Sequence, residues 1–180
     1  MAVELDGAPW RVLPVDVVVR SGLVEGRALD RETLRLVRRE LRRAEALSVA
    51  GRALRGRDLS RRRLTERLEQ RVSPAAAAES LATLERAGLV DDERVARTRA
   101  HALAERGWGD VAIRHRLRAE AFDESVLEDA VRGVEPEAER ARRLVDRRGP
   151  GPQTARYLAG RGFAEEAVEA ALGAAFGQDG

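Results

Sequence analysis

Two short segments concentrate arginine at spacings that suit contact with an anionic partner. The candidate side chains are Arg61, Arg62, Arg63 and Arg67 in the first segment and Arg114, Arg116 and Arg118 in the second. Each segment follows a turn signal and has the length of a short helix, like the recognition element of a helix-turn-helix. The simpler interpretation is a solvated helix face, because Glu66 and Glu69 interleave with the first run and support a helix there.

Carboxylates and histidines offer a second possible chemistry. Asp91, Asp92 and Glu93 could bind a metal ion or act as acids and bases, but helix capping explains all three. His101 and His115 lack the spacing of a metal site and are interpreted as surface or interface residues. The Gly-Pro-Gly-Pro segment at residues 149–152 is no phosphate loop, because proline has no backbone N–H. These features predict no enzyme, no bound metal and no cofactor.

Composition excludes several classes and shows an uneven charge distribution. The 180 residues include no cysteine, so disulfides, thiolate metal sites and cysteine nucleophiles are excluded, and all 33 basic residues are arginine. The net charge is only +2, yet residues 35–71 hold 13 arginines against 5 acids, and residues 121–139 hold 1 arginine against 7 acids. This asymmetry predicts one surface that faces an anionic partner. Without an apolar run of roughly 20 residues, no membrane contact is expected and a cytoplasmic protein is favoured.

A tight joint between two helices is predicted near the middle of the chain. Gly88 suits the left-handed position just past a helix C-terminus. Asp91 is a good N-cap for the next helix, and Asp92 adds negative charge at the positive end of the helix dipole. Leu89 and Val90 are apolar and are expected to face a core. Gly88, Asp91 and Asp92 are therefore assigned a structural role.

The first 30 residues differ from the rest and predict a short β-hairpin-like leader. An Asp6-Gly7 turn signal lies between partly alternating apolar residues, and Pro9 suits an edge strand. A second β-prone run contains Val15, Val17, Val18 and Val19. Two short strands alone are marginal in stability, so the leader is expected to pack against a helix.

From Asp30 onward the pattern is helical, and one frame recurs in three copies. Leu54, Leu103 and Leu144 each precede a second leucine by 14 residues, at Leu68, Leu117 and Leu158. Two further apolar positions follow in each copy, first Val72, Phe122 and Phe163 and then Leu81, Val131 and Leu172. A period between about 40 and 50 residues is typical of helical repeat arrays, whose neighbouring units bury a shared core.

The predicted fold class is all-α, with three tandem three-helix repeats after the hairpin-like leader. The predicted boundaries are a leader at 1–30, an N-terminal helix with the first repeat at 31–90, the second repeat at 91–133, the third at 134–176 and a tail at 177–180. Three helices of about 12 residues with short links are enough to form one small bundle per repeat.

The joint and its surroundings resemble the RecX family, the bacterial regulators of the recombinase RecA. The resemblance is carried by the segments 88–97, 106–109 and 113–117 and, upstream, by 53–54 and 59–68. It covers about residues 42–175, and members also have a short β-prone leader. The chain departs from the family pattern at Val95, where members usually have an aromatic residue. Arg97 and Arg106 lie in the matched segments and join the candidates for binding to RecA or DNA.

This resemblance implies an extended, curved array of three repeats with a non-enzymatic activity. Such a protein binds in the groove of RecA filaments on single-stranded DNA and limits filament extension, strand exchange and co-protease activity in DNA repair and the SOS response. The expected partners are the RecA filament and, weakly and without sequence preference, single-stranded DNA, with double-stranded DNA as a further candidate. The protein is expected to be a cytoplasmic monomer without a cofactor.

Two other functions fit the residues. A helix-turn-helix-like transcriptional regulator binds duplex DNA sequence-specifically by itself, whereas the RecX-like function predicts weak, salt-sensitive and sequence-neutral binding. A helical scaffold without a nucleic-acid partner is the third possibility. It predicts that neutralising the arginines between residues 61 and 67 changes nothing but solubility.

Overall fold

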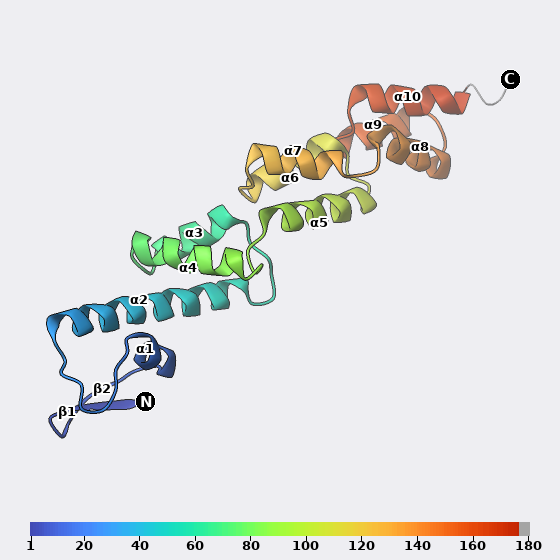
Figure 1. The fold of residues 1–180 in the computed structure, drawn as a ribbon. Helices are drawn as coiled ribbons and strands as arrows, with labels where there is room; N and C mark the ends of the chain where they lie inside the picture. The colour runs from blue at the N-terminus through green and yellow to red at the C-terminus, as the bar shows by residue number, and fades with distance from the viewer. Residues whose placement is uncertain (177–180) are drawn as a thin grey trace. The chain divides into compact units, whose positions relative to one another are not determined.

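Ten helices follow a two-stranded hairpin in the computed structural model, which describes residues 1–176 (Figure 1). The hairpin comprises β1 (Ala2–Leu5) and β2 (Ala8–Val12), and the helices are α1 (Val15–Arg20), α2 (Arg31–Leu54), α3 (Arg61–Glu69), α4 (Pro74–Arg86), α5 (Asp92–Glu105), α6 (Asp110–Ala119), α7 (Glu124–Arg132), α8 (Glu137–Arg148), α9 (Pro152–Gly160) and α10 (Glu165–Phe176). The predicted all-α class with a hairpin leader is therefore confirmed. The predicted tail, 177–180, lies outside the described residues.

The hairpin forms where the turn signal predicted it. Asp6 and Gly7 have φ angles of 51° and 78°, as a two-residue turn between right-twisted strands requires. The strands are antiparallel, with Leu5 opposite Ala8 and an irregularity after Val3 that accommodates the proline of β2. The leader packs on the first half of α2 through an apolar cluster, as the marginal stability of a lone hairpin requires.

The run from Val15 to Val19 is helical, so the prediction of a second β-prone run is wrong. Val17 and Val18 of α1 and Ser21 at its C-cap are buried, and positions three and four residues apart lie on one face of a helix. The side chain of Ser21 donates to the carbonyl oxygen of Val17 (2.6 Å). Burial of this face against α2 outweighs the preference of valine for strands, because β-propensity mostly reflects packing context.

Each unit of the fold is stabilised by its own apolar clusters. The chain divides into two compact units, Met1–Val90 and a second that begins at Asp91. In the first unit, the second half of α2 shares a core with α3 and α4. In the second unit, α5, α6 and α7 share one core, and α8, α9 and α10 share another. Within residues 1–176, none of the helices combines the length and hydropathy of a membrane span.

The recurring leucine frame marks the middle helix of each group. Leu68, Leu117 and Leu158 lie near the ends of α3, α6 and α9 and are completely buried. Phe122 and Phe163, which follow two of them, are also buried. The period in the sequence therefore corresponds to three successive groups of three helices, which confirms the predicted repeats.

The helix joint has the predicted local chemistry at three of its four key positions. Gly88 has a φ of 67°, and the N–H of Leu89 donates to the carbonyl oxygen of Leu84 (2.9 Å), which closes α4 with a left-handed cap. The Asp91 carboxylate accepts from the N–H of Arg94 (2.9 Å) at the start of α5. Val90 is buried in the core of the first unit. Leu89 is 57% exposed, so the expectation that it faces a core is wrong.

Replacing Asp91 with alanine is expected to lower the free energy of unfolding by about 1 kcal/mol, because the N–H of Arg94 loses its acceptor. Urea unfolding followed by circular dichroism measures the loss. Asp91→Asn is the matched control, since asparagine keeps an oxygen acceptor at the cap. An alanine variant as stable as the original chain would show that the cap contributes nothing.

Candidate binding groove

The helix groups α5–α7 and α8–α10 meet in a close backbone contact. The N–H of Gly109 donates to the carbonyl oxygen of Arg161 (2.9 Å), and the N–H of Val111 donates to that of Gly162 (3.1 Å). A Cβ atom on Gly109 would lie 2.2 Å from the carbonyl oxygen of Gly162. Gly162 itself has a φ of 75°, and its own Cβ would lie 2.6 Å from that of Ala112. Only glycine permits this approach, which holds the start of α6 against the turn after α9.

Arg140 of α8 lies at the centre of the same contact and is only 4% exposed. Its guanidinium donates to the carbonyl oxygens of Glu135 (2.9 Å) and Trp108 (2.6 Å) and forms an ion pair with Asp110. The N–H of Asp110 in turn donates to Oε1 of Glu137 (2.5 Å). A buried guanidinium is stable only when its charge and donors are matched in this way. Arg140 therefore fixes the backbone around Trp108 to α8.

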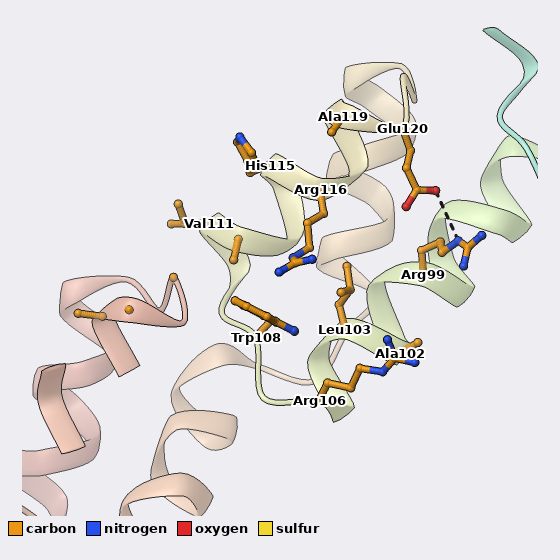
Figure 2. A pocket seen from close by; sticks show the side chains of 14 residues that line it. Arg99, Ala102, Leu103, Arg106, Trp108, Val111, His115, Arg116, Ala119 and Glu120 are labelled. Carbon is orange, nitrogen blue, oxygen red and sulfur yellow. Dashed lines mark ion pairs between the residues drawn. The ribbon is translucent and has the colours of Figure 1, made fainter. Parts of the chain in front are cut away.

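A wide groove of about 900 Å³ lies beside this contact, lined by α5, α6 and the end of α9 (Figure 2). Its apolar lining includes Ala102, Leu103, Val111, Ala112 and Ala159. Its polar lining includes Arg99, Arg106, Arg116, His115 and Glu120, together with Trp108. We call this feature the α5–α6 groove.

Arginine and aromatic side chains alternate in a series that starts in the α5–α6 groove, with Arg116 and Trp108, and continues outside its lining. Figure 2 shows Arg116 beside Trp108. The guanidinium carbon of Arg116 lies 4.0 Å from the centroid of the Trp108 ring, and that of Arg161 lies 4.5 Å from it. Arg161 also lies 5.2 Å from the ring of Tyr157, which is 3.9 Å from Arg148. We call these five side chains the arginine–aromatic ladder. Cation–π attraction orders the guanidinium groups without neutralising their charge.

The α5–α6 groove has an excess of positive charge. Arg99 is paired with Glu120 at 3.5 Å. Across residues 1–176, no carboxylate lies within ion-pair distance of Arg106, Arg116 or Arg161. Arg106 and Arg116 line the groove, and Arg161 beside them donates to the carbonyl oxygen of Arg106 (3.3 Å). An anionic ligand binds such arginines through charge-assisted, two-point hydrogen bonds.

The three candidate arginines of α6 divide between two faces of the helix. Arg114 donates to Glu128 (2.8 Å) and Arg118 donates to Glu124 (3.0 Å), so both are engaged by α7. These hydrogen bonds raise the pKa of each arginine above its ordinary value. Arg116 lies on the other face and lines the α5–α6 groove. Of the nine arginines predicted from the sequence, Arg106 and Arg116 are the two that line this groove.

The first arginine segment lies on α3, in the other unit. Arg61 donates to Glu85 of α4 (2.6 Å), and the side chains of Arg62 and Arg63 lie 3.6 Å and 3.2 Å from Glu66. The two remaining candidates are exposed, Arg67 on α3 and Arg97 on α5. The pairs with Glu66 match the predicted helix-supporting interactions. The contribution of these arginines to binding stays a prediction.

Sequence reasoning did not find the arginine–aromatic ladder. Arg148 ends α8, Tyr157 lies in α9 and Arg161 lies in the turn after α9. All three are far along the chain from Trp108, and no local spacing connects them to it. The one feature of the sequence that points to this site is Trp108 between two glycines. It places a large aromatic side chain on a turn, where the ring packs against other side chains. His115 lines the groove and His101 is exposed, and no cluster of metal-binding side chains occurs in the described part of the chain.

Gly109→Ala is expected to lower the free energy of unfolding of the second unit. The loss should lie near the upper end of the range of about 1–3 kcal/mol seen for overpacked sites. The reason is that the added Cβ meets backbone atoms rather than a movable side chain. Gly160→Ala is the matched control, because a Cβ there has open space around it. Equal urea midpoints for the two variants would contradict the close contact.

Acidification tests the ion pairs on the other side of α6. The hydrogen bond from Arg118 lowers the pKa of Glu124 below its ordinary value of 4.5. Because the pKa is lowered by folding, this carboxylate stabilises the fold above pH 4.5 and the contribution is lost as the pH falls further. Glu124→Gln should therefore reduce the difference in urea midpoint between about pH 6 and about pH 3. Glu169→Gln on α10 is the control and should leave that difference unchanged.

Comparison with known proteins supports the architecture and gives no match by sequence. No protein-family model matches the chain, and no curated protein matches it. The structure is similar to a crystal structure of regulatory protein RecX, with a TM-score of 0.76 and 21% sequence identity. The match covers 93% of this chain and 90% of that chain. The resemblance predicted from the sequence is thus confirmed for the fold: the chain has the fold of the regulatory protein RecX.

Proposed function

We propose that this chain is a non-enzymatic regulator of the recombinase RecA. The observation that carries the proposal is the similarity of its fold to regulatory protein RecX over 93% of the chain. The segments of sequence that resemble the RecX family supply independent support, because they include the joint at Gly88 and Asp91 and the glycine turn at Trp108. Both segments have the local structure that the resemblance implies.

The proposed mechanism is surface contact with the RecA filament. The protein binds in the groove of filaments on single-stranded DNA and restricts filament extension, strand exchange and co-protease activity in DNA repair and the SOS response. Exposed arginines on α3 and in the α5–α6 groove are the proposed contacts with the partner or with DNA. Their DNA affinity is weak and sequence-neutral, since exposed guanidinium groups mainly contact phosphates. The protein acts as a cytoplasmic monomer.

A sequence-specific helix-turn-helix regulator has weaker support. A recognition helix needs exposed side chains that are free to read base edges. On α6, Arg114 and Arg118 are engaged by Glu128 and Glu124 of the same unit. This pairing favours the RecA-directed proposal over direct readout of duplex DNA by α6.

The decisive experiment adds the purified chain to RecA filaments and measures DNA-dependent ATP hydrolysis and strand exchange. Both activities should fall as the chain approaches stoichiometric amounts. Neutralising the four arginines between residues 61 and 67 to glutamine should weaken inhibition about tenfold, because each exposed charge contributes a few tenths of a kcal/mol. Neutralising four exposed arginines elsewhere, at positions 132, 142, 147 and 156, is the matched control and should change inhibition far less.

Two outcomes would overturn this proposal. The first is unchanged RecA activity at a stoichiometric excess of folded chain. The second is tight, sequence-specific binding to duplex DNA by the chain alone, which would support the transcriptional regulator instead.

A further inference from the structure

We propose that the α5–α6 groove binds an extended acidic peptide segment of a partner protein, with an aliphatic side chain flanked by carboxylates. The aliphatic side chain fits the apolar lining, and the carboxylates fit the arginines. The inference rests on the proposed function only for the identity of the partner, since the chemistry of the ligand follows from the groove itself.

The apolar lining needs a ligand that covers it. Val111 is 56% exposed, although it belongs to α6 of a well-packed helix group. Leu103 and Ala112 are half-buried beside it and continue the same apolar surface. Burial of an aliphatic side chain here removes apolar area from water on both partners. A charged ligand without an apolar group, such as free phosphate, would leave this apolar surface exposed to water.

The positions of the arginines suit the binding of carboxylates. Arg116 and Arg161 both lie over the Trp108 ring, with their guanidinium carbons 4.0 Å and 4.5 Å from its centroid. A guanidinium in such a contact keeps N–H donors at its edge for an oxyanion. The planar fork of arginine matches the two oxygens of a carboxylate. Because the ladder already restricts both side chains, little rotamer freedom is lost when a ligand binds.

The same ladder disfavours a nucleic acid as the occupant. Single strands bind proteins largely by stacking bases on aromatic rings. Two guanidinium groups lie within 4.5 Å of the centroid of Trp108, in the place that a stacked base would take. The aliphatic lining also has no counterpart on a phosphate backbone.

A second copy of this chain is disfavoured because its own acidic segment is already engaged. Within residues 121–139, the carboxylates that have a partner inside the chain are Glu124, Glu128, Asp129, Glu135, Glu139 and Glu137. Their partners are arginines or, for the last one, a backbone N–H of α6. Releasing them to bind another copy would break these interactions. The loss of these interactions favours an acidic segment of a different protein over residues 121–139 of a second copy.

The test uses the full chain with Trp10→Phe, so that Trp108 is the single tryptophan and reports on the groove. The probe is the peptide acetyl-Glu-Asp-Leu-Asp-Glu-amide, and binding is followed by indole fluorescence and by titration calorimetry. A peptide with glycine in place of leucine should bind about fivefold more weakly, because the apolar contact is lost. A peptide with glutamine and asparagine in place of the acids should bind at least about tenfold more weakly.

Three variants of the chain separate the groove from the rest of the surface. Arg116→Ala should weaken binding about tenfold by removing a charge-assisted contact. Val111→Glu should weaken it at least as much, and it is expected to fold because Val111 is exposed. Arg156→Ala, on an exposed position of α9 outside the groove, should leave the affinity within about twofold of the original.

Several results would overturn the proposal. These are an absence of peptide binding, equal binding of the uncharged peptide, or displacement of the peptide by oligothymidylate at equal concentration. Concentration-dependent self-association that Val111→Glu abolishes would assign the groove to a second copy. Peptide binding is measured without RecA, so its failure is distinct from a failure to inhibit RecA.

Discussion

The backbone contact between Gly109 and the turn at Gly162 is the constraint on which the second unit depends. Neither glycine tolerates a Cβ, and the hydrogen bonds from Gly109 and Val111 bring α6 and α9 into register. Arg140 lies beside this contact and matches three acceptors with one buried guanidinium. Removal of the Asp110 carboxylate would leave a buried charge unmatched, and loss of either carbonyl contact would leave buried N–H donors without an acceptor.

This contact also creates the candidate site. Trp108 lies between the two glycines of the turn before α6, and Arg140 binds its carbonyl oxygen. Its ring is therefore held where Arg161, from the turn after α9, can stack on it. The groups α5–α7 and α8–α10, which have separate apolar cores, thus both contribute side chains to the arginine–aromatic ladder. A surface arginine without such support would pay for binding with the rotamer entropy of its long side chain.

Local rules predicted much of the fold but little of this site. Asp30, Ser60 and Asp91 are N-caps whose bonds reach only three residues along the chain, so the sequence shows them directly. The helix at Val15–Arg20 was not predicted, because its burial against α2 is a tertiary effect. The same limit applies to the site. The partner of Arg140 is 30 residues away, and spacing rules of three or four residues cannot find it.

Because the chain contains only arginine as a basic residue, position rather than residue type separates structural from binding cations. On α6, Arg114 and Arg118 are spaced by one helical turn and both meet carboxylates of α7, which gives them a stabilising role. Arg116 lies between them in sequence and therefore on another face, where it meets an aromatic ring instead. Stacking keeps its charge unpaired and its orientation fixed. Lysine could not combine these properties, because an ammonium group has no plane to stack and no fork for a carboxylate.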